Sequence, residues 1–126
     1  MSVLIDSHGW VEFFAGGPLA EKYARYVDGA NTAEYLTPSV VVYEVYKRVK
    51  MLMGEGLALK AISFITTHTT IIDADKKIAL NAAEISIRHK LAMADAIIKA
   101  TAEDRGAKII TGDPHFKGFP DVVFIS

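Results

Sequence analysis

Short runs rich in β-branched residues alternate along the chain with longer stretches whose apolar positions repeat every three or four residues. The short runs predict strands, because so few residues cannot complete a stable helix and because Val, Ile and Thr suit a pleated surface. They cover residues 3–5, 34–37, 70–72, 108–111 and 122–125. The pattern therefore predicts about five strands.

The longer stretches predict helices. We place them at about 18–27, 39–53, 57–67, 75–90 and 93–105. Ser39 is the expected N-cap of the second helix, and Asp73 and Asp75 are the expected capping residues of the fourth, because short oxygen-bearing side chains satisfy free backbone N–H groups. Gly54 and Gly106 stand where two helices are expected to end. The start of the second helix also has strand propensity, so both structures remain open there.

Alternation of strands and helices is typical of an α/β fold with a mainly parallel central sheet. We expect about five strands flanked by helices on both faces. The 126 residues, 51% of them hydrophobic, suffice for one packed core, so the expectation is a single domain over residues 1–126. In such sheets ligands collect beyond the carboxyl ends of the strands.

Composition narrows the chemistry of the site. The chain has no cysteine, which excludes disulfides and thiolate metal sites and favours a reducing compartment. Its four histidines include no pair at i, i+4, which disfavours zinc. The N-terminus lacks a basic segment before a long apolar run, and nothing approaches a membrane span, so we expect a cytoplasmic protein with no membrane contact. The net charge of −1 does not indicate a strongly basic nucleic-acid binder.

Four carboxylates are the candidate chemistry, and each also has an ordinary local explanation. Asp6 ends the first strand and could be a turn or helix-capping aspartate, since the Ser7-His8-Gly9 that follows is typical of a turn. Glu44 stands four residues before Arg48, as in a helical ion pair. Asp95 starts a helix of small residues, where the helix dipole favours an acid. Asp113 precedes a proline, as turns often do. For Asp6 and Glu44 taken alone, the local explanation is the better one.

The four carboxylates taken together favour a functional explanation over the local ones. If the topology is as predicted, all four carboxylates meet at one edge of the sheet. Two like charges about 4 Å apart repel by about 4 kcal/mol at an effective dielectric near 20, so such a group requires bound cations or protonation. Oxygen ligands without cysteine select Mg²⁺ or Mn²⁺. These ions promote hydrolysis of phosphodiester bonds, which predicts cleavage of a nucleic-acid backbone.

At this point the sequence resembles the PIN-domain ribonuclease family, and within it the VapC-type toxins of toxin–antitoxin pairs. The resemblance extends from residue 3 to residue 125. It rests on an apolar strand ending in Asp6-Ser7, a helix carrying Glu44, the helix start Ala94-Asp95-Ala96, and the segment 111–116, Thr-Gly-Asp-Pro-His-Phe. His8-Gly9 departs from the Asn or Ser that many relatives have there.

The resemblance implies that Asp6, Glu44 and Asp95 bind the metal, Mg²⁺ or Mn²⁺, with Asp113 as a fourth acidic group acting directly or through water. It implies that the hydroxyls of Ser7 and Thr111 support the site. The family also implies an α/β sandwich with a parallel sheet, an RNA substrate, a homodimer and a small antitoxin protein as inhibitor.

Other side chains could serve those partners, although an ordinary role is the expectation for each. An antitoxin groove would use aromatic and methionine side chains on the helices at 18–27 and 40–67, which singly are expected to be core: Tyr23, Tyr26, Tyr43, Tyr46, Met51 and Met53. RNA phosphates would use basic side chains that singly are expected to be solvated: Lys47, Arg48, Lys50, Arg88, Lys90, Lys99 and Lys117. Trp10 is expected in the core or a dimer contact. His115, two residues after Asp113, could touch substrate or metal, but a surface loop is the expectation.

Four alternatives compete with the toxin. A housekeeping PIN nuclease for RNA processing, without an antitoxin, would use the same catalytic residues. A Mg-binding phospho-receiver domain usually has an acidic pair after its first strand, and a phosphatase would need a second Asp at position 8, where this chain has His. An inactive PIN-like binding module is disfavoured because all four acidic positions are kept.

Overall fold

The computed structural model describes residues 2–126 and confirms the α/β prediction. Its five strands form one parallel sheet in the order β3-β2-β1-β4-β5. The strands are β1 (Val3–Ile5), β2 (Tyr35–Pro38), β3 (Thr70–Ile72), β4 (Lys108–Thr111) and β5 (Val122–Phe124). Each of the five predicted strands is therefore present, with both ends of β2 and the carboxyl end of β5 shifted by one residue.

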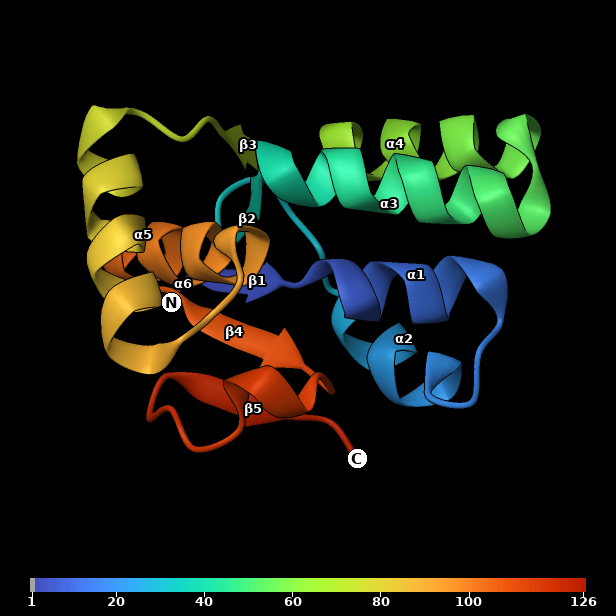
Figure 1. Ribbon diagram of the computed structural model, residues 1–126. Coiled ribbons are helices and arrows are strands. Elements are labelled where there is room, and N and C mark those ends of the chain that lie inside the picture. The colour runs from blue at the N-terminus through green and yellow to red at the C-terminus, as the bar shows by residue number, and fades with distance from the viewer. Residues whose placement is uncertain (1) are drawn as a thin grey trace.

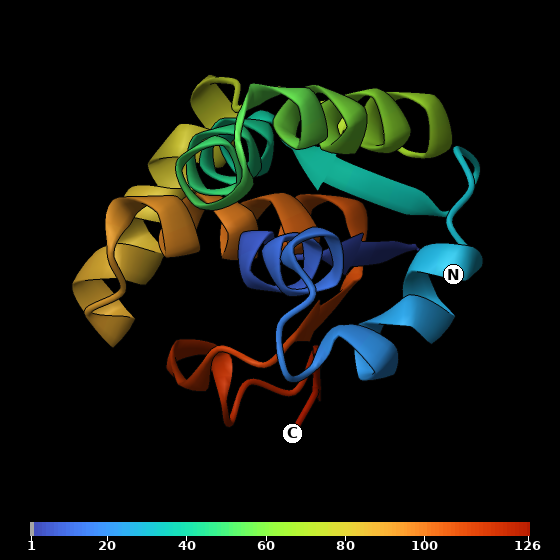
Figure 2. The same cartoon turned by 90° about the vertical axis from the view of Figure 1, so that its right-hand side faces the viewer.

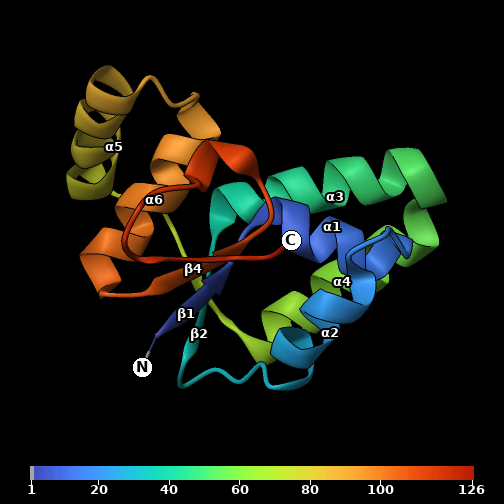
Figure 3. The same cartoon turned by 90° about the horizontal axis from the view of Figure 1, so that it is seen from below.

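Six α-helices connect the strands in the described part of the chain. They are α1 (Ser7–Ala15), α2 (Ala20–Asp28), α3 (Ser39–Met53), α4 (Glu55–His68), α5 (Lys76–His89) and α6 (Met93–Arg105). Helices α3 and α4 run side by side, and α5 packs on α6 (Figure 1). Helices α1 and α3 also pack together, and Figure 2 views both nearly end-on. Figure 3 shows α5 and α6 on one side of the strands and α2 and α4 on the other.

The order of the strands defines the ligand edge of the sheet. After β1 the chain adds β2 and β3 on one side, and then crosses to add β4 and β5 on the other. The direction of winding therefore reverses between β1 and β4, whose carboxyl ends lie side by side, with Ile5 in register with Ile110. Crevices at such reversals are where open parallel sheets bind ligands.

Helix α1 is the main departure from the sequence prediction, which placed a turn at Ser7-His8-Gly9. Asp6 caps this helix, since its Oδ1 accepts a hydrogen bond from the backbone N–H of Gly9 at 2.9 Å. Trp10 is fully buried and stacks on Phe14, as expected of a core residue. Packing of the apolar face thus stabilises α1 although its third residue, Gly9, is a poor helix former.

Two capping predictions are wrong. Ser39 is the first residue of α3 instead of its N-cap, which is Pro38 and makes no side-chain capping bond. Asp73 is exposed and precedes the actual cap of α5, Asp75, whose Oδ1 accepts from the backbone N–H of Ile78 at 2.9 Å. The open question at the start of α3 is settled in favour of helix. Gly54 and Gly106 end α3 and α6 as predicted.

No helix in residues 2–126 combines the length and hydropathy that a membrane crossing needs.

Candidate active site

Asp6 sits at the junction of β1 and α1 and is almost fully buried, with 2% of its surface exposed. Its Oδ1 accepts from the Gly9 N–H at 2.9 Å, and its Oδ2 accepts from the Thr111 hydroxyl at 2.5 Å. Burial raises the pKa of Asp6 from 3.8 to about 7; these two hydrogen bonds act against that rise, and the charges of Asp113 and Asp95 add to it. Asp6 therefore both caps α1 and contributes a carboxylate to the acidic cluster.

Asp113 follows β4 and caps a single 3₁₀ turn, Pro114–Phe116. Its backbone N–H donates to the Thr111 hydroxyl at 2.9 Å, and its Oδ1 accepts from the backbone N–H of His115 at 2.9 Å. Phe116 is fully buried and anchors the turn. The turn expected from the sequence is thus present, and it fixes the position of the carboxylate.

Asp95 lies in the first turn of α6, where neighbouring residues are small and Ala96 is buried. The pKa of Asp95 is raised from 3.8 to about 6, mainly by burial and also by the charges of Asp113 and Glu44, whereas the His115 ring acts in the opposite direction. Asp113 and Glu44 thus lie near enough for their charges to act on Asp95.

Glu44 joins this cluster from α3, the helix after β2. Its side chain is half-buried, and its Oε1 is buried without a hydrogen-bond partner among the described residues. The ion pair with Lys47 or Arg48 that the sequence suggested is not formed within residues 2–126. Glu44 therefore carries an unsatisfied acceptor next to other acidic groups, which is costly without a cation or proton.

Of the two hydroxyls expected to support the site, one does so in this structure. Thr111 is fully buried and links Asp6 to the backbone of Asp113. Ser7 begins α1 and is half-buried, and its hydroxyl makes no hydrogen bond within residues 2–126. The strand end thus contributes the hydroxyl that orients a carboxylate.

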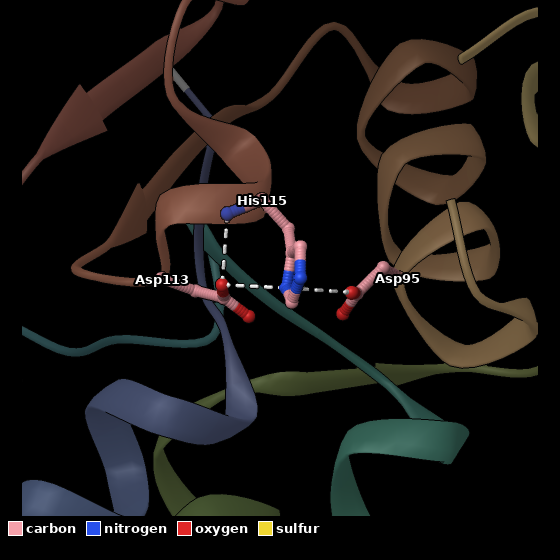
Figure 4. Close-up of side chains that lie close together, drawn as sticks. All are labelled: Asp95, Asp113 and His115. Carbon is pink, nitrogen blue, oxygen red and sulfur yellow. Dashed lines mark hydrogen bonds and ion pairs between the residues drawn. The ribbon is translucent and has the colours of Figure 1, made fainter. Parts of the chain in front are cut away.

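His115, which was expected on a surface loop, also belongs to the cluster. Its ring is exposed, as expected, but Nδ1 lies 2.9 Å from Asp113 Oδ1 and 3.8 Å from Asp95 Oδ2. One ligand atom from each of Asp95, Asp113 and His115 can be chosen so that all lie within 4.8 Å of one another (Figure 4). The only sequence signal was its place two residues after Asp113.

Several side chains considered for partners differ from expectation. Tyr43, Met51 and Met53 are 61%, 77% and 54% exposed, so the core prediction is wrong for these three, whereas Tyr23 is fully buried. Lys99 is neither solvated nor free to bind phosphate. It is buried, with Nζ 2.8 Å from Glu103 Oε2 and 3.0 Å from Asp121 Oδ2.

Comparisons with known proteins identify the family and the fold. The sequence model of the PIN domain matches residues 3–122. A toxin–antitoxin complex from Klebsiella pneumoniae contains a chain 27% identical to this one, with a TM-score of 0.77 and a match covering 97% of this chain and 96% of that chain. A search of curated protein sequences found no match.

Two further solved structures share the fold at lower identity. VapC20 of Mycobacterium tuberculosis, described as a sarcin-ricin loop cleaving toxin, is 20% identical, with a TM-score of 0.78 over 96% of this chain and 98% of that chain. VapBC2 of Rickettsia felis, bound to a DNA fragment from its promoter, is 17% identical, with a TM-score of 0.75 over 98% of this chain and 97% of that chain.

Proposed function

This chain belongs to the PIN domain family, and on that premise we propose that it is a metal-dependent endoribonuclease that hydrolyses RNA phosphodiester bonds. The observation that carries the proposal is the gathering of acidic groups at one edge of the sheet. Thr111 links the Asp6 carboxylate to the backbone of Asp113. Asp95 and Asp113 offer ligand atoms within 4.8 Å of each other. Because the chain belongs to the PIN domain family, we set aside the phospho-receiver and phosphatase alternatives.

The residues fit a divalent cation. Asp6, Glu44 and Asp95 are the proposed ligands, with Asp113 as a fourth acidic group. The buried Glu44 Oε1 without a partner and the raised pKa of Asp95 both mark negative charge that a cation would neutralise. Oxygen donors of this kind suit Mg²⁺ or Mn²⁺. When bound, such an ion orients and acidifies water and stabilises charge on the phosphate.

The chain's own residues perform the positioning. Thr111 and the Gly9 N–H hold both oxygens of Asp6, so that this carboxylate presents fixed lone pairs to the cluster. Asp113 is held by the 3₁₀ turn that it caps. Exposed basic side chains, including Lys47, Arg48 and Lys117, are the proposed contacts for RNA phosphates.

We further propose that the enzyme acts in the cytoplasm as a homodimeric toxin of a toxin–antitoxin pair. The support is the 27% identical chain of the Klebsiella pneumoniae toxin–antitoxin complex. A small antitoxin would block the acidic site with basic side chains and pack an apolar segment on the exposed Tyr43, Met51 and Met53.

Cleavage of a mixed RNA pool tests the nuclease proposal. We expect purified protein to cut RNA with Mg²⁺ or Mn²⁺ and to stop in EDTA, and we expect Asp95→Asn to lose at least about 100-fold in rate while folding normally. Asp73→Asn makes the same chemical change at an exposed aspartate outside the cluster and should leave the rate unchanged. Equal cleavage with EDTA, or by Asp95→Asn, would disprove the assigned site.

Growth distinguishes the toxin from the housekeeping nuclease. Expression of the wild type alone should arrest growth, Asp95→Asn should not, and co-expression of a small protein encoded beside the gene should restore growth. A housekeeping enzyme would cut RNA in vitro but leave growth unaffected and have no such neighbour.

A further inference from the structure

His115 reaches the acidic cluster through its side chain, although it stands on an exposed turn. The imidazole is 73% exposed, whereas the Asp95 and Asp113 side chains are 19% and 23% exposed. Figure 4 shows the His115 ring between the two carboxylates, with dashed lines that mark its contacts. The three residues together offer one nitrogen and two oxygens that lie within 4.8 Å of one another.

The distances suit one shared ion. In octahedral geometry with bonds of about 2.1 Å, neighbouring ligand atoms are about 3.0 Å apart and opposite ones about 4.2 Å. His115 Nδ1 is 2.9 Å from Asp113 Oδ1 and 3.8 Å from Asp95 Oδ2, and one choice of ligand atoms keeps all three within 4.8 Å. Small side-chain rotations bring such atoms into the octahedral range.

An ion pair does not account for this placement. A contact between an imidazole that is 73% exposed and a carboxylate contributes about 0–1 kcal/mol to folding. The backbone already fixes Asp113, since its Oδ1 accepts the His115 N–H at 2.9 Å. Buried Phe116 anchors the same turn from its other side, so the backbone that carries the ring is fixed beside the cluster.

We propose that the imidazole of His115 is a ligand of the bound cation and makes the site prefer Mn²⁺ over Mg²⁺. This deepens the proposed function and rests on it, because it concerns the same cation. Mg²⁺ selects oxygen donors and gives up water reluctantly, whereas nitrogen donors favour transition-metal ions. Replacing one oxygen of an acidic site by an imidazole nitrogen therefore strengthens Mn²⁺ binding more than Mg²⁺ binding.

Metal binding by the purified protein tests this without any measurement of RNA cleavage. Isothermal titration with Mn²⁺ and with Mg²⁺ gives both affinities, and electron spin-echo modulation of bound Mn²⁺ detects a coordinated ¹⁴N nucleus. We expect ¹⁴N modulation in the wild type and its loss in His115→Ala, with Mn²⁺ affinity lowered about tenfold and Mg²⁺ affinity lowered less than about threefold. His115→Asp should restore binding without nitrogen modulation and shift the preference toward Mg²⁺.

His89→Ala is the matched control, because His89 is an exposed histidine whose ring packs on Phe119 at 4.9 Å, outside the cluster. It should retain both affinities and the nitrogen modulation. Modulation that persists in His115→Ala, or unchanged affinities in that variant, would overturn the ligand assignment.

The two proposals fail separately. Metal-dependent RNA cleavage by a wild type whose Mn²⁺ shows no nitrogen modulation would overturn the role of His115 and keep the nuclease. Nitrogen modulation lost in His115→Ala, in a protein that cuts no RNA and arrests no growth, would keep the ligand and count against the nuclease. A wild type that binds neither ion would overturn both.

Discussion

The Thr111 hydroxyl donates a hydrogen bond to Asp6 Oδ2 at 2.5 Å and accepts one from the Asp113 N–H at 2.9 Å. Thr111 is the last residue of β4 and is fully buried. One hydroxyl therefore couples the acidic groups at the ends of two neighbouring strands. Because its hydrogen bond to Asp6 is buried, solvent cannot compensate for the loss of that bond.

Thr111→Val tests this coupling, since valine keeps the shape and removes the hydroxyl. We expect the variant to lose about 1–3 kcal/mol in free energy of unfolding and about tenfold in metal affinity, because Asp6 is left less oriented and the Asp113 N–H loses its acceptor. Urea denaturation and isothermal titration measure the two effects. Thr111→Ser retains the hydroxyl and should recover most of the affinity; a serine variant as weak as valine would show that packing matters instead.

The metal-free protein should become less stable as the pH rises. Burial raises the pKa of Asp6 to about 7 and that of Asp95 to about 6, from 3.8 in each case. The folded state therefore holds these protons more tightly than the unfolded chain, so their stabilising contribution is complete below about pH 3.8 and is lost as the pH passes through 6 to 7.

We expect the free energy of unfolding in EDTA to fall by on the order of 2 kcal/mol between pH 5 and pH 8, after allowance for solvent screening near Asp95. Urea titrations at a series of pH values measure it. Asp95→Asn should be more stable than the wild type at pH 8 and show a smaller fall, because one repelling charge is gone. A wild type whose metal-free stability rises over this range would contradict the buried acidic cluster.

The elements that the sequence predicted well are those whose own pattern determines them. The strands are short and β-branched, and α6 begins and ends at the predicted residues, closed by Gly106. Helix α1 escaped prediction because Ser7-His8-Gly9 has the composition of a turn. Its helical state depends on contacts distant in sequence: a Cβ on Gly9 would meet Tyr23 and Ile5 side chains at 2.6 and 2.7 Å. Local sequence propensity cannot predict that packing.

The candidate site shows the same division. Asp6 and Asp113 could be placed because each directly follows a predicted strand, and parallel strands bring such residues to one edge. Glu44 and Asp95 lie on helices, so their approach depended on the family resemblance. His115 could not be placed, since the direction of its ring is set by a single 3₁₀ turn and by the burial of Phe116, which the sequence pattern does not specify.

Glu44→Gln should separate stability from metal binding. The substitution removes the charge of a carboxylate whose Oε1 is buried without a partner among the described residues, and keeps its size. We expect the metal-free variant to be about 1 kcal/mol more stable than the wild type at neutral pH, because a repelling charge is gone. We also expect it to lose most of the stabilisation by Mn²⁺.

Thermal unfolding with and without Mn²⁺ measures both effects. Mn²⁺ at a concentration of about 100 times its dissociation constant should add about 2.7 kcal/mol to the free energy of unfolding of the wild type. For a domain of this size, that raises the midpoint of thermal unfolding by roughly 10 °C. Glu84→Gln makes the same change at an exposed glutamate of α5 and should show the wild-type shift. A Glu44→Gln protein that keeps the full shift would remove Glu44 from the ligand set.

Two glycine substitutions test whether the start of α1 is as tightly packed as the structure indicates. Gly9→Ala places a Cβ 2.6 Å from Tyr23 Cε1 and 2.7 Å from Ile5 Cγ2, so side chains of the core must move. Overpacking of this kind costs about 1–3 kcal/mol. It also displaces the Gly9 N–H from Asp6 Oδ1, so we expect weaker metal binding at temperatures where the variant remains folded.

Gly56→Ala is the matched control, because Gly56 lies in α4 and a Cβ there meets no atom within 4 Å. The gain in helix propensity should stabilise that variant by up to about 1 kcal/mol and leave metal affinity unchanged. Urea denaturation and isothermal titration of both variants measure the contrast. If Gly9→Ala were as stable as Gly56→Ala and bound the ion normally, α1 would have room to shift, and Asp6 could not owe its orientation to the packing of Gly9 against Tyr23.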